Sequence, residues 1–357
     1  MNSYPALHWI DGDWRDSAPH RPSIDPATSE IIGEYADGGV EQAQRAIDAA
    51  RKAFLATAWA SDKALRSRAL HELADAFERH SDELVETLSR ENGKVREQAR
   101  FEVSLAPSKL RYYASLALVD EGRAVQARAG ALSVVVRQPV GVAGIIVPWN
   151  APVILMVRSL APALAAGTTA VIKMPGQTAQ TNALLAWIMS QAPSIPPGVI
   201  NLFTESGSDG AKHLVESPDV PVISFTGSTA TGRAITRAGA KHLKRLGLEL
   251  GGKTPMVVFD DADPADVVPA LVSALTTFAG QFCMTGSRVL VQRGVADELR
   301  RRLAERVAAV KVGPASGAAS AMGPLIDKGN VERVDRALQA GNAAGARARV
   351  RAGPGSG

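Results

Sequence analysis

Residues 141–173 read GVAGIIVPWNAPVILMVRSLAPALAAGTTAVIK, which is a short apolar run, a longer apolar segment and a second short apolar run. The short runs, 142–147 and 169–173, have the length and the nearly continuous apolar character of strands that are covered on both faces. The segment between them, 153–166, has the length of a helix. Together they predict two parallel strands joined by a crossover helix.

The same alternation continues to residue 250. Further strands are predicted at 199–203, 222–225 and 246–250, and further helices at 179–191, 209–215 and 229–240. This order is typical of a doubly wound parallel sheet with helices on both faces, which is an α/β fold. Ligands bind such sheets beyond the carboxyl ends of the strands, so polar residues that follow a strand are candidate site residues.

The residues before this sheet are predicted to be mainly helical. An alternation of apolar and polar residues around an Asp-Gly pair predicts an opening hairpin at 9–14. Apolar residues recur at three- and four-residue spacing in 40–54 and 70–77, and a third helix is expected at 98–118. We expect these helices to cover the sheet.

Length and composition indicate two domains, because 357 residues, 46% of them hydrophobic, exceed the usual size of a single core. Strands and helices alternate again after residue 250, with strands at 256–259 and 289–292 and helices at 267–278 and 297–310. We therefore predict a doubly wound cofactor domain at 1–120 and 140–249, a hairpin at 121–139, an incomplete α/β catalytic domain at 250–340 and a disordered tail, rich in Gly, Ala and Arg, at 341–357.

Composition argues against several classes of partner. The net charge of +4 is small and both signs are interspersed, so no nucleic-acid partner is expected. Arg158 and Pro162 interrupt the longest apolar region, 151–172, which argues against a membrane span. One cysteine cannot form an internal disulfide, the six histidines lack ligand spacing, and the N-terminus does not resemble a signal peptide. We expect a cytoplasmic protein without a metal site.

Cys283 is the only cysteine and a candidate nucleophile. A cysteine attacks as the thiolate, so it needs a partly exposed site with hydrogen-bond donors or positive charge nearby. A lone cysteine is more often an inert core residue. Glycines at 280 and 286 favour a loop around Cys283, but the residues alone leave both interpretations open.

Two polar residues end predicted strands earlier in the chain. Asn150 follows the first strand, in the sequence VPWN at 147–150, and its amide could stabilise an oxyanion. The alternative role is a turn former or helix cap. Glu249 ends the strand at 246–250 and could act as a general base. Its alternative role is a salt-bridged carboxylate beside a turn.

Two segments resemble the signatures of the NAD(P)-dependent aldehyde dehydrogenases, namely LELGGK at 248–253 and FAGQFC at 278–283. The resemblance implies oxidation of a small-molecule aldehyde to a carboxylic acid. Cys283 would attack the aldehyde, Asn150 would hold the oxyanion, and Glu249 would direct water onto the thioester. Relatives that transfer the acyl group to coenzyme A do not generally keep this glutamate, so Glu249 favours hydrolysis.

A further segment, FTGSTATGR at 225–233, is similar to the cofactor-binding F-T-G-S-x-x-x-G-R of the same family. It lies between a predicted strand and a predicted helix, where backbone N–H groups can hold a pyrophosphate. The resemblance implies that the protein binds NAD or NADP and that Lys173 bonds the adenosine ribose hydroxyls. The other residues implied in cofactor binding are Gly227, Ser228, Gly232, Trp149 and Gly176.

The sequence departs from the family pattern at two cofactor positions. NAD-preferring relatives often carry an acidic residue three positions after the lysine, and Gly176 stands there, which leaves the choice between NAD and NADP open. Glu205 stands where relatives usually have glycine. We therefore expect the adenine end of the site to be shaped differently.

The resemblance covers about Trp9 to Ala340 and then ends, so we expect a C-terminally truncated member. The alternative function is therefore a catalytically impaired protein that retains only dinucleotide or subunit binding. In the family, the segment that corresponds to 121–139 joins subunits, which implies a homo-oligomer if the C-terminal part were present. A surface hairpin without this role is the alternative.

Overall fold

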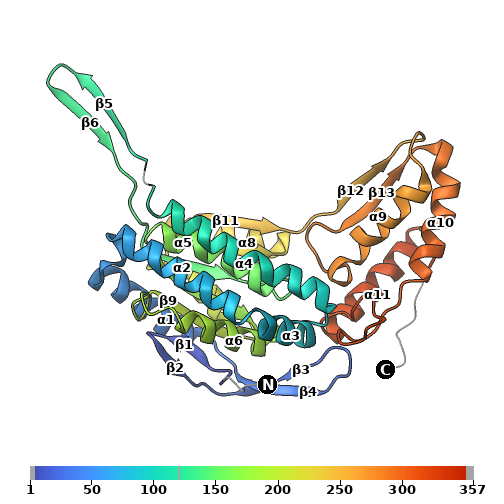
Figure 1. The fold of residues 1–357 in the computed structure, drawn as a ribbon, viewed down its shortest axis with the longest axis horizontal. Helices are drawn as coiled ribbons and strands as arrows, with labels where there is room; N and C mark the ends of the chain where they lie inside the picture. The colour runs from blue at the N-terminus through green and yellow to red at the C-terminus, as the bar shows by residue number, and fades with distance from the viewer. Residues whose placement is uncertain (1–4, 120, 351–357) are drawn as a thin grey trace. The chain divides into compact units, whose positions relative to one another are not determined.

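The structure is a computed structural model that describes residues 5–119 and 121–350. The chain divides into two compact units (Figure 1). The first comprises Met1–Ser23, Gly33–Leu84 and Phe101–Leu250, and the second comprises Ile24–Ile32, Val85–Arg100 and Gly251–Gly357.

Two segments of the second unit, 24–32 and 85–100, come from the region that the sequence assigned to the cofactor domain. The segment 85–100 belongs to the second unit because it contacts residues after position 250. Gln98 Oε1 accepts a hydrogen bond from Phe278 N at 3.0 Å, and the Lys94 ammonium lies 3.9 Å from the centre of the Phe278 ring. Long-range contacts of this kind leave no local pattern in the sequence.

A seven-stranded sheet forms the centre of the first unit, in the order β11-β10-β7-β8-β9-β1-β2. Five neighbouring strands are parallel: β7 (Val142–Ile146), β8 (Thr169–Pro175), β9 (Ile200–Glu205), β10 (Val222–Gly227) and β11 (Arg245–Leu250). The opening hairpin, β1 (His8–Ile10) and β2 (Asp13–Arg15), adds antiparallel strands beside β9. The predicted doubly wound α/β fold is confirmed, and the strand order reverses between β7 and β10.

Helices cover both faces of this sheet. On one face, α1, α7 and α8 contact one another or the strands, and on the other face α2 packs on α5 and α6. These helices are α1 (Val40–Ala56), α2 (Lys63–Arg79), α5 (Pro152–Ala165), α6 (Ala179–Ser190), α7 (Asp209–Glu216) and α8 (Thr229–Gly239). Two further helices, α3 (Ser81–Asn92) and α4 (Arg96–Leu116), pass from one unit to the other.

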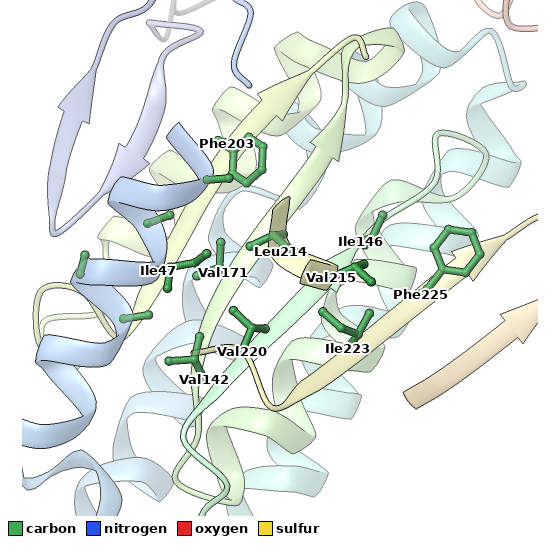
Figure 2. Packing of buried hydrophobic residues seen from close by; sticks show 14 of the residues in the cluster. Ile47, Val142, Ile146, Val171, Phe203, Leu214, Val215, Val220, Ile223 and Phe225 are labelled. Carbon is green, nitrogen blue, oxygen red and sulfur yellow. The ribbon is translucent and has the colours of Figure 1, made fainter. Parts of the chain in front are cut away.

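The core beneath α1 and α7 holds this sheet together (Figure 2). Ile47 of α1 and Leu214 of α7 are completely buried and pack in one cluster with Val171 and Ile223 of the strands. Full burial of such a side chain contributes roughly 1.5–3 kcal/mol. The apolar spacing that predicted α1 therefore corresponds to its buried face.

A hairpin extends away from the helices of the first unit, made of β5 (Arg123–Arg128) and β6 (Ala131–Val135) (Figure 1). Its strands are antiparallel, and Gly130 at the turn has a φ of 75°, which glycine adopts without strain. Nearly all of its side chains are exposed. Its role in joining subunits stays a prediction.

The second unit has its own small α/β core. The parallel strands β12 (Thr254–Val258) and β13 (Gly286–Val291) pack with α9 (Pro264–Thr276) and α10 (Ala296–Ala308). A last helix, α11 (Lys328–Ala343), follows, so the predicted disorder from residue 341 is wrong for the three residues that end this helix. The predicted tail at 351–357 lies outside the described residues. Two short strands, β3 (His20–Ile24) and β4 (Ile31–Ala36), form a separate sheet.

His8, in β1 next to the edge strand of the main sheet, makes stability depend on pH. Its Nδ1 accepts a hydrogen bond from Thr204 N at 3.3 Å, so its Nε2 carries the proton and donates to Ser17 Oγ at 2.8 Å. Burial lowers the pKa of His8 to about 4. An unfolded histidine has a pKa of about 6.5 and binds the proton first, so stability is lost as the pH falls from about 6.5 to about 4.

We expect this single group to remove roughly 3 kcal/mol of unfolding free energy between pH 7 and pH 4. Urea unfolding of the protein and of His8→Gln, measured across that range, isolates the effect because glutamine does not titrate. The exposed His71 provides a matched control as His71→Gln. A His8→Gln protein whose stability falls as steeply as that of the parent would contradict the assignment.

Candidate active site

Three neighbouring strands bring the polar residues of the first unit to one edge of the sheet. Ile146 of β7 pairs with Phe225 of β10, and Thr226 of β10 pairs with Glu249 of β11. Asn150 follows β7 and Ser228 follows β10, so both lie beyond the carboxyl ends of adjacent parallel strands. This edge is the switch point at which open α/β sheets bind ligands.

Glu102 of α4 positions the turn that carries Asn150. Its carboxylate Oε1 accepts hydrogen bonds from Val153 N at 2.9 Å and from Ile154 N at 3.4 Å. Ala151, the N-cap residue of α5, has no side-chain oxygen that could accept these hydrogen bonds. Glu102 is completely buried, so its charge is satisfied by the N-terminal end of α5. This contact could not be predicted from local sequence patterns, because Glu102 and Val153 are 51 residues apart.

Removal of this buried acceptor is expected to lower stability. Glu102→Ala leaves the first N–H groups of α5 without their acceptor, which should lower the free energy of unfolding by roughly 2–3 kcal/mol. Glu102→Gln keeps one acceptor oxygen, so the free energy of unfolding should fall by about half as much. Urea unfolding measures both values. Glu97→Ala, at an exposed position of the same helix, is the control, and an equal loss in Glu97→Ala and Glu102→Ala would refute the capping role.

Glu249 points away from the core on β11. Its side chain is 65% exposed, and its Oε2 lies 3.7 Å from Arg158 Nη1. Arg158 also donates a hydrogen bond from Nη2 to Thr226 Oγ1 at 3.0 Å. This ion pair agrees with the alternative, structural role of Glu249. Exposed ion pairs, however, contribute only ~0–1 kcal/mol to stability. The pair therefore does not prevent Glu249 from turning towards a substrate.

The segment after β10 has the features of an anion site. Ser228 caps α8, since its Oγ accepts a hydrogen bond from Thr231 N at 3.1 Å. The N-terminal end of a helix carries partial positive charge and suits a phosphate. The two glycines also have packing roles: a Cβ at Gly227 would lie 2.5 Å from the Phe225 ring, and a Cβ at Gly232 would lie 2.7 Å from Leu250.

Lys173 and Gly176 lie at the end of β8. Lys173 is only 8% exposed, so it is not a solvated surface residue. Burial lowers the pKa of its ammonium group, and the negative charges of Glu205 and Asp37 oppose that shift. Gly176 leaves no room for a side chain, because a Cβ there would collide with the Tyr35 hydroxyl group.

Cys283 belongs to the second unit and is exposed. The chain before it turns through three successive left-handed residues, with φ of 51° at Phe278, 55° at Ala279 and 73° at Gly280. This conformation is unfavourable for the two residues that are not glycine, and such strain is concentrated at functional sites. The Phe278 and Phe282 rings lie 4.9 Å apart and brace the turn.

The candidate residues are thus divided between the units. The first unit brings together Asn150, Glu249 and the segment at 225–233, and Lys173 lies on the strand beside β7. The approach of Cys283 to Asn150 and Glu249 stays a prediction. Within residues 5–119 and 121–350, no group of three or more His, Cys, Asp and Glu side chains is arranged to hold a metal ion, and no helix is long and apolar enough to cross a membrane.

Comparison with known proteins connects this arrangement to a family. A family model described as "Aldehyde dehydrogenase family" matches residues 14–356. The chain belongs to the aldehyde dehydrogenase family. Among its relatives, the 2-aminomuconic semialdehyde dehydrogenase of Mus musculus is 37% identical over 92% of this chain and 67% of its own length. The betaine aldehyde dehydrogenase of Bacillus subtilis is 36% identical over 95% of this chain and 70% of its own.

Solved structures have the same fold. HpcC of Thermus thermophilus matches with a TM-score of 0.91 and 39% identity, over 96% of this chain and 67% of its own. The betaine aldehyde dehydrogenase of Staphylococcus aureus, solved in complex with NAD+, matches with a TM-score of 0.94 and 32% identity, over 98% and 71%. The predicted family, an NAD(P)-dependent enzyme with NAD or NADP as cofactor, is confirmed, and the chain spans about two thirds of these relatives.

Proposed function

We propose that this aldehyde dehydrogenase oxidises an aldehyde to a free carboxylic acid with NAD+ or NADP+ and water. The observation that carries the proposal is the grouping of Asn150, Glu249 and the capped N-terminus of α8 at the carboxyl edge of three adjacent strands. The exposed thiol of Cys283, next to a strained turn, supplies the nucleophile.

In the first step, the Cys283 thiolate forms a bond to the aldehyde carbon, and the carbonyl electron pair moves to oxygen. The resulting thiohemiacetal oxygen is negative, so it requires hydrogen-bond donors that are already in place. The Asn150 side-chain amide and the backbone N–H of Cys283 are these donors. Loss of one such donor usually costs about 3–4 kcal/mol of transition-state stabilisation.

The first unit fits the dinucleotide. The positive end of α8 at Ser228 suits the pyrophosphate, and Lys173 suits the ribose hydroxyls as a donor held at a strand end. When bound, the dinucleotide supplies the acceptor for the hydride that leaves the thiohemiacetal carbon. Asn150 and Cys283 keep the reacting carbon in place during this transfer, which leaves a thioester on Cys283.

Glu249 completes the cycle. Its carboxylate takes a proton from a water molecule, whose oxygen attacks the thioester carbon. The carbon–sulfur bond then breaks, the electron pair returns to Cys283 as thiolate, and the carboxylate product leaves. Overall, an aldehyde, NAD(P)+ and water give a carboxylate, NAD(P)H and two protons. Transfer of the acyl group to coenzyme A would not need this carboxylate.

The substrate class and the assembly follow from exposed apolar residues. Phe282 and Met284 flank Cys283, and Met284 is 67% exposed, which favours an apolar aldehyde. On the hairpin of β5 and β6, the exposed side chains of Leu132 and Val134 favour burial against another subunit. We therefore propose that the protein is a homo-oligomer if the C-terminal part is present. The single cysteine, which cannot form an internal disulfide, supports a cytoplasmic location.

The proposal is tested with the purified chain and a panel of aliphatic, aromatic and charged aldehydes. Reduction of NAD+ and NADP+ is followed by absorbance, and the product is identified by mass spectrometry. We expect the free acid with no consumption of added coenzyme A. Dinucleotide binding without turnover of any aldehyde would instead favour the non-catalytic alternative, and a coenzyme A thioester would contradict the role of Glu249.

A further inference from the structure

Glu205, the residue that departs from the family pattern, lies beside Lys173. It is the last residue of β9 and pairs with Pro175 of β8, two positions after Lys173. Side chains two positions apart on a strand share a face of the sheet, so Lys173 and Glu205 project from the same face. Glu205 is 3% exposed and Lys173 is 8% exposed, and the negative charge of Glu205 acts on the buried ammonium group of Lys173.

Hydrogen bonds fix the Glu205 carboxylate at the start of α7. Oε1 accepts from Gly210 N at 2.7 Å, and Oε2 accepts from Ala211 N at 3.2 Å. These donors and the positive end of the helix stabilise a negative charge. The same helix end could otherwise receive a phosphate. Glu205 therefore occupies a place where an anionic ligand group could have been bound.

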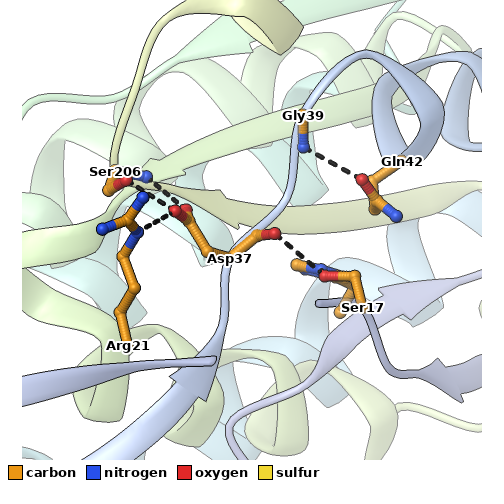
Figure 3. Close-up of polar contacts among 7 residues, drawn as sticks. Ser17, Arg21, Asp37, Gly39, Gln42 and Ser206 are labelled. Atoms are coloured by element: carbon orange, nitrogen blue, oxygen red, sulfur yellow. Dashed lines mark hydrogen bonds and ion pairs between the residues drawn. The ribbon is translucent and has the colours of Figure 1, made fainter. Parts of the chain in front are cut away.

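A second carboxylate, that of Asp37, contacts Ser206, the residue that follows Glu205 (Figure 3). Asp37 accepts hydrogen bonds from Ser206 N at 2.7 Å and from Ser206 Oγ at 2.6 Å, and it pairs with Arg21. Ser206 is also the residue that a Cβ at Gly176 would approach to 3.1 Å. A side chain at position 176 would thus require Tyr35 and Ser206 to shift, whereas Glu205 and Asp37 supply carboxylates beside Ser206 without such a shift.

We propose that Glu205, supported by Asp37, makes the enzyme select NAD+ over NADP+. The inference rests on the proposed function, because it takes Lys173 as the residue that holds the adenosine ribose. The positive charges of Lys173 and Arg21 are matched by the negative charges of Glu205 and Asp37, and Glu205 accepts the hydrogen bonds that the start of α7 offers. A phosphate on the ribose 2′-oxygen would therefore add negative charge to a group of four charges that is already neutral, in which Lys173, Arg21 and the start of α7 each have an acidic partner.

The test is the ratio of NAD+ to NADP+ affinity, measured by calorimetry with the whole chain. We expect the parent to bind NAD+ at least roughly tenfold more tightly, and Glu205→Gln to narrow the ratio by about tenfold, because it removes one nearby charge and keeps the size of the side chain. Glu205→Gly, the residue that relatives usually carry, should shift the ratio in the same direction if Glu205→Gln does not fold. Glu216→Gln, exposed at the other end of α7, should leave the ratio unchanged.

A parent that prefers NADP+, or a ratio that stays the same when Glu205 is replaced, would overturn the selection role while leaving the proposed function intact. A parent that binds neither dinucleotide would overturn the proposed function and this inference together.

Discussion

Replacement of Cys283 by alanine is expected to abolish aldehyde-dependent reduction of NAD(P)+, with kcat lowered by at least about 10³-fold. The chain contains no second cysteine, so no other thiol can form the thioester. The side chain is exposed, so its loss leaves no cavity and should change stability by less than about 0.5 kcal/mol. The measurement is steady-state turnover, with dinucleotide affinity recorded in parallel.

Alkylation provides an independent check of the same residue. Iodoacetamide should add one group to the parent and none to Cys283→Ala, and turnover of the parent should fall in proportion to the mass shift. Dinucleotide affinity should stay the same in the variant, which separates loss of the nucleophile from loss of the cofactor site. Turnover at the parental rate in Cys283→Ala would refute the covalent mechanism.

Most of the fold of the first unit was predictable because its central parallel strands, β7, β8 and β9, are covered on both faces. All five residues of β7 and all seven of β8 are buried, which is why continuous apolar runs in the sequence identified them. The strand ends followed from the same runs. As a result, the positions of Asn150 and Glu249 at the carboxyl edge could also be predicted.

Two elements with little buried surface, β3 and α11, escaped prediction. Four of the five residues of β3 are exposed, and α11 contains no buried residue, so burial imposed no strong pattern on either sequence. For α11, weak signals were nevertheless present. Val331, Val334 and Leu338 recur at three- and four-residue spacing, and Asp327 caps the helix by accepting from Asn330 N.

Supporting residues of the site could not be predicted, because their partners are distant in the chain. Glu102 caps a helix 51 residues away, and Asp37 binds Ser206 across 169 residues. Each is a common acidic residue with no local motif. Lys173 shows the same limit: its identity was visible in the sequence, but its burial between two carboxylates depends on how β8, β9 and the segment before α1 pack.

Replacement of Glu249 by glutamine is expected to stop the cycle after hydride transfer. The thioester then forms at close to the normal rate but is hydrolysed slowly, since glutamine cannot accept the proton from water. Steady-state turnover should fall by roughly 10²–10⁴-fold. Rapid mixing should show a burst of one NAD(P)H per active site, and mass spectrometry should detect the acyl group on Cys283.

Arg158 allows the catalytic role of Glu249 to be separated from its ion pair. If the carboxylate served only to bind Arg158, then Arg158→Gln and Glu249→Gln would break the same exposed contact, and each would cost at most about 1 kcal/mol of stability with no burst. A general base predicts a different result, because only Glu249→Gln removes the proton acceptor. If acyl enzyme accumulates in Glu249→Gln while Arg158→Gln turns over at the parental rate, the Glu249 carboxylate must act on water. Equal behaviour of the two variants would instead show that Glu249 has only a structural role.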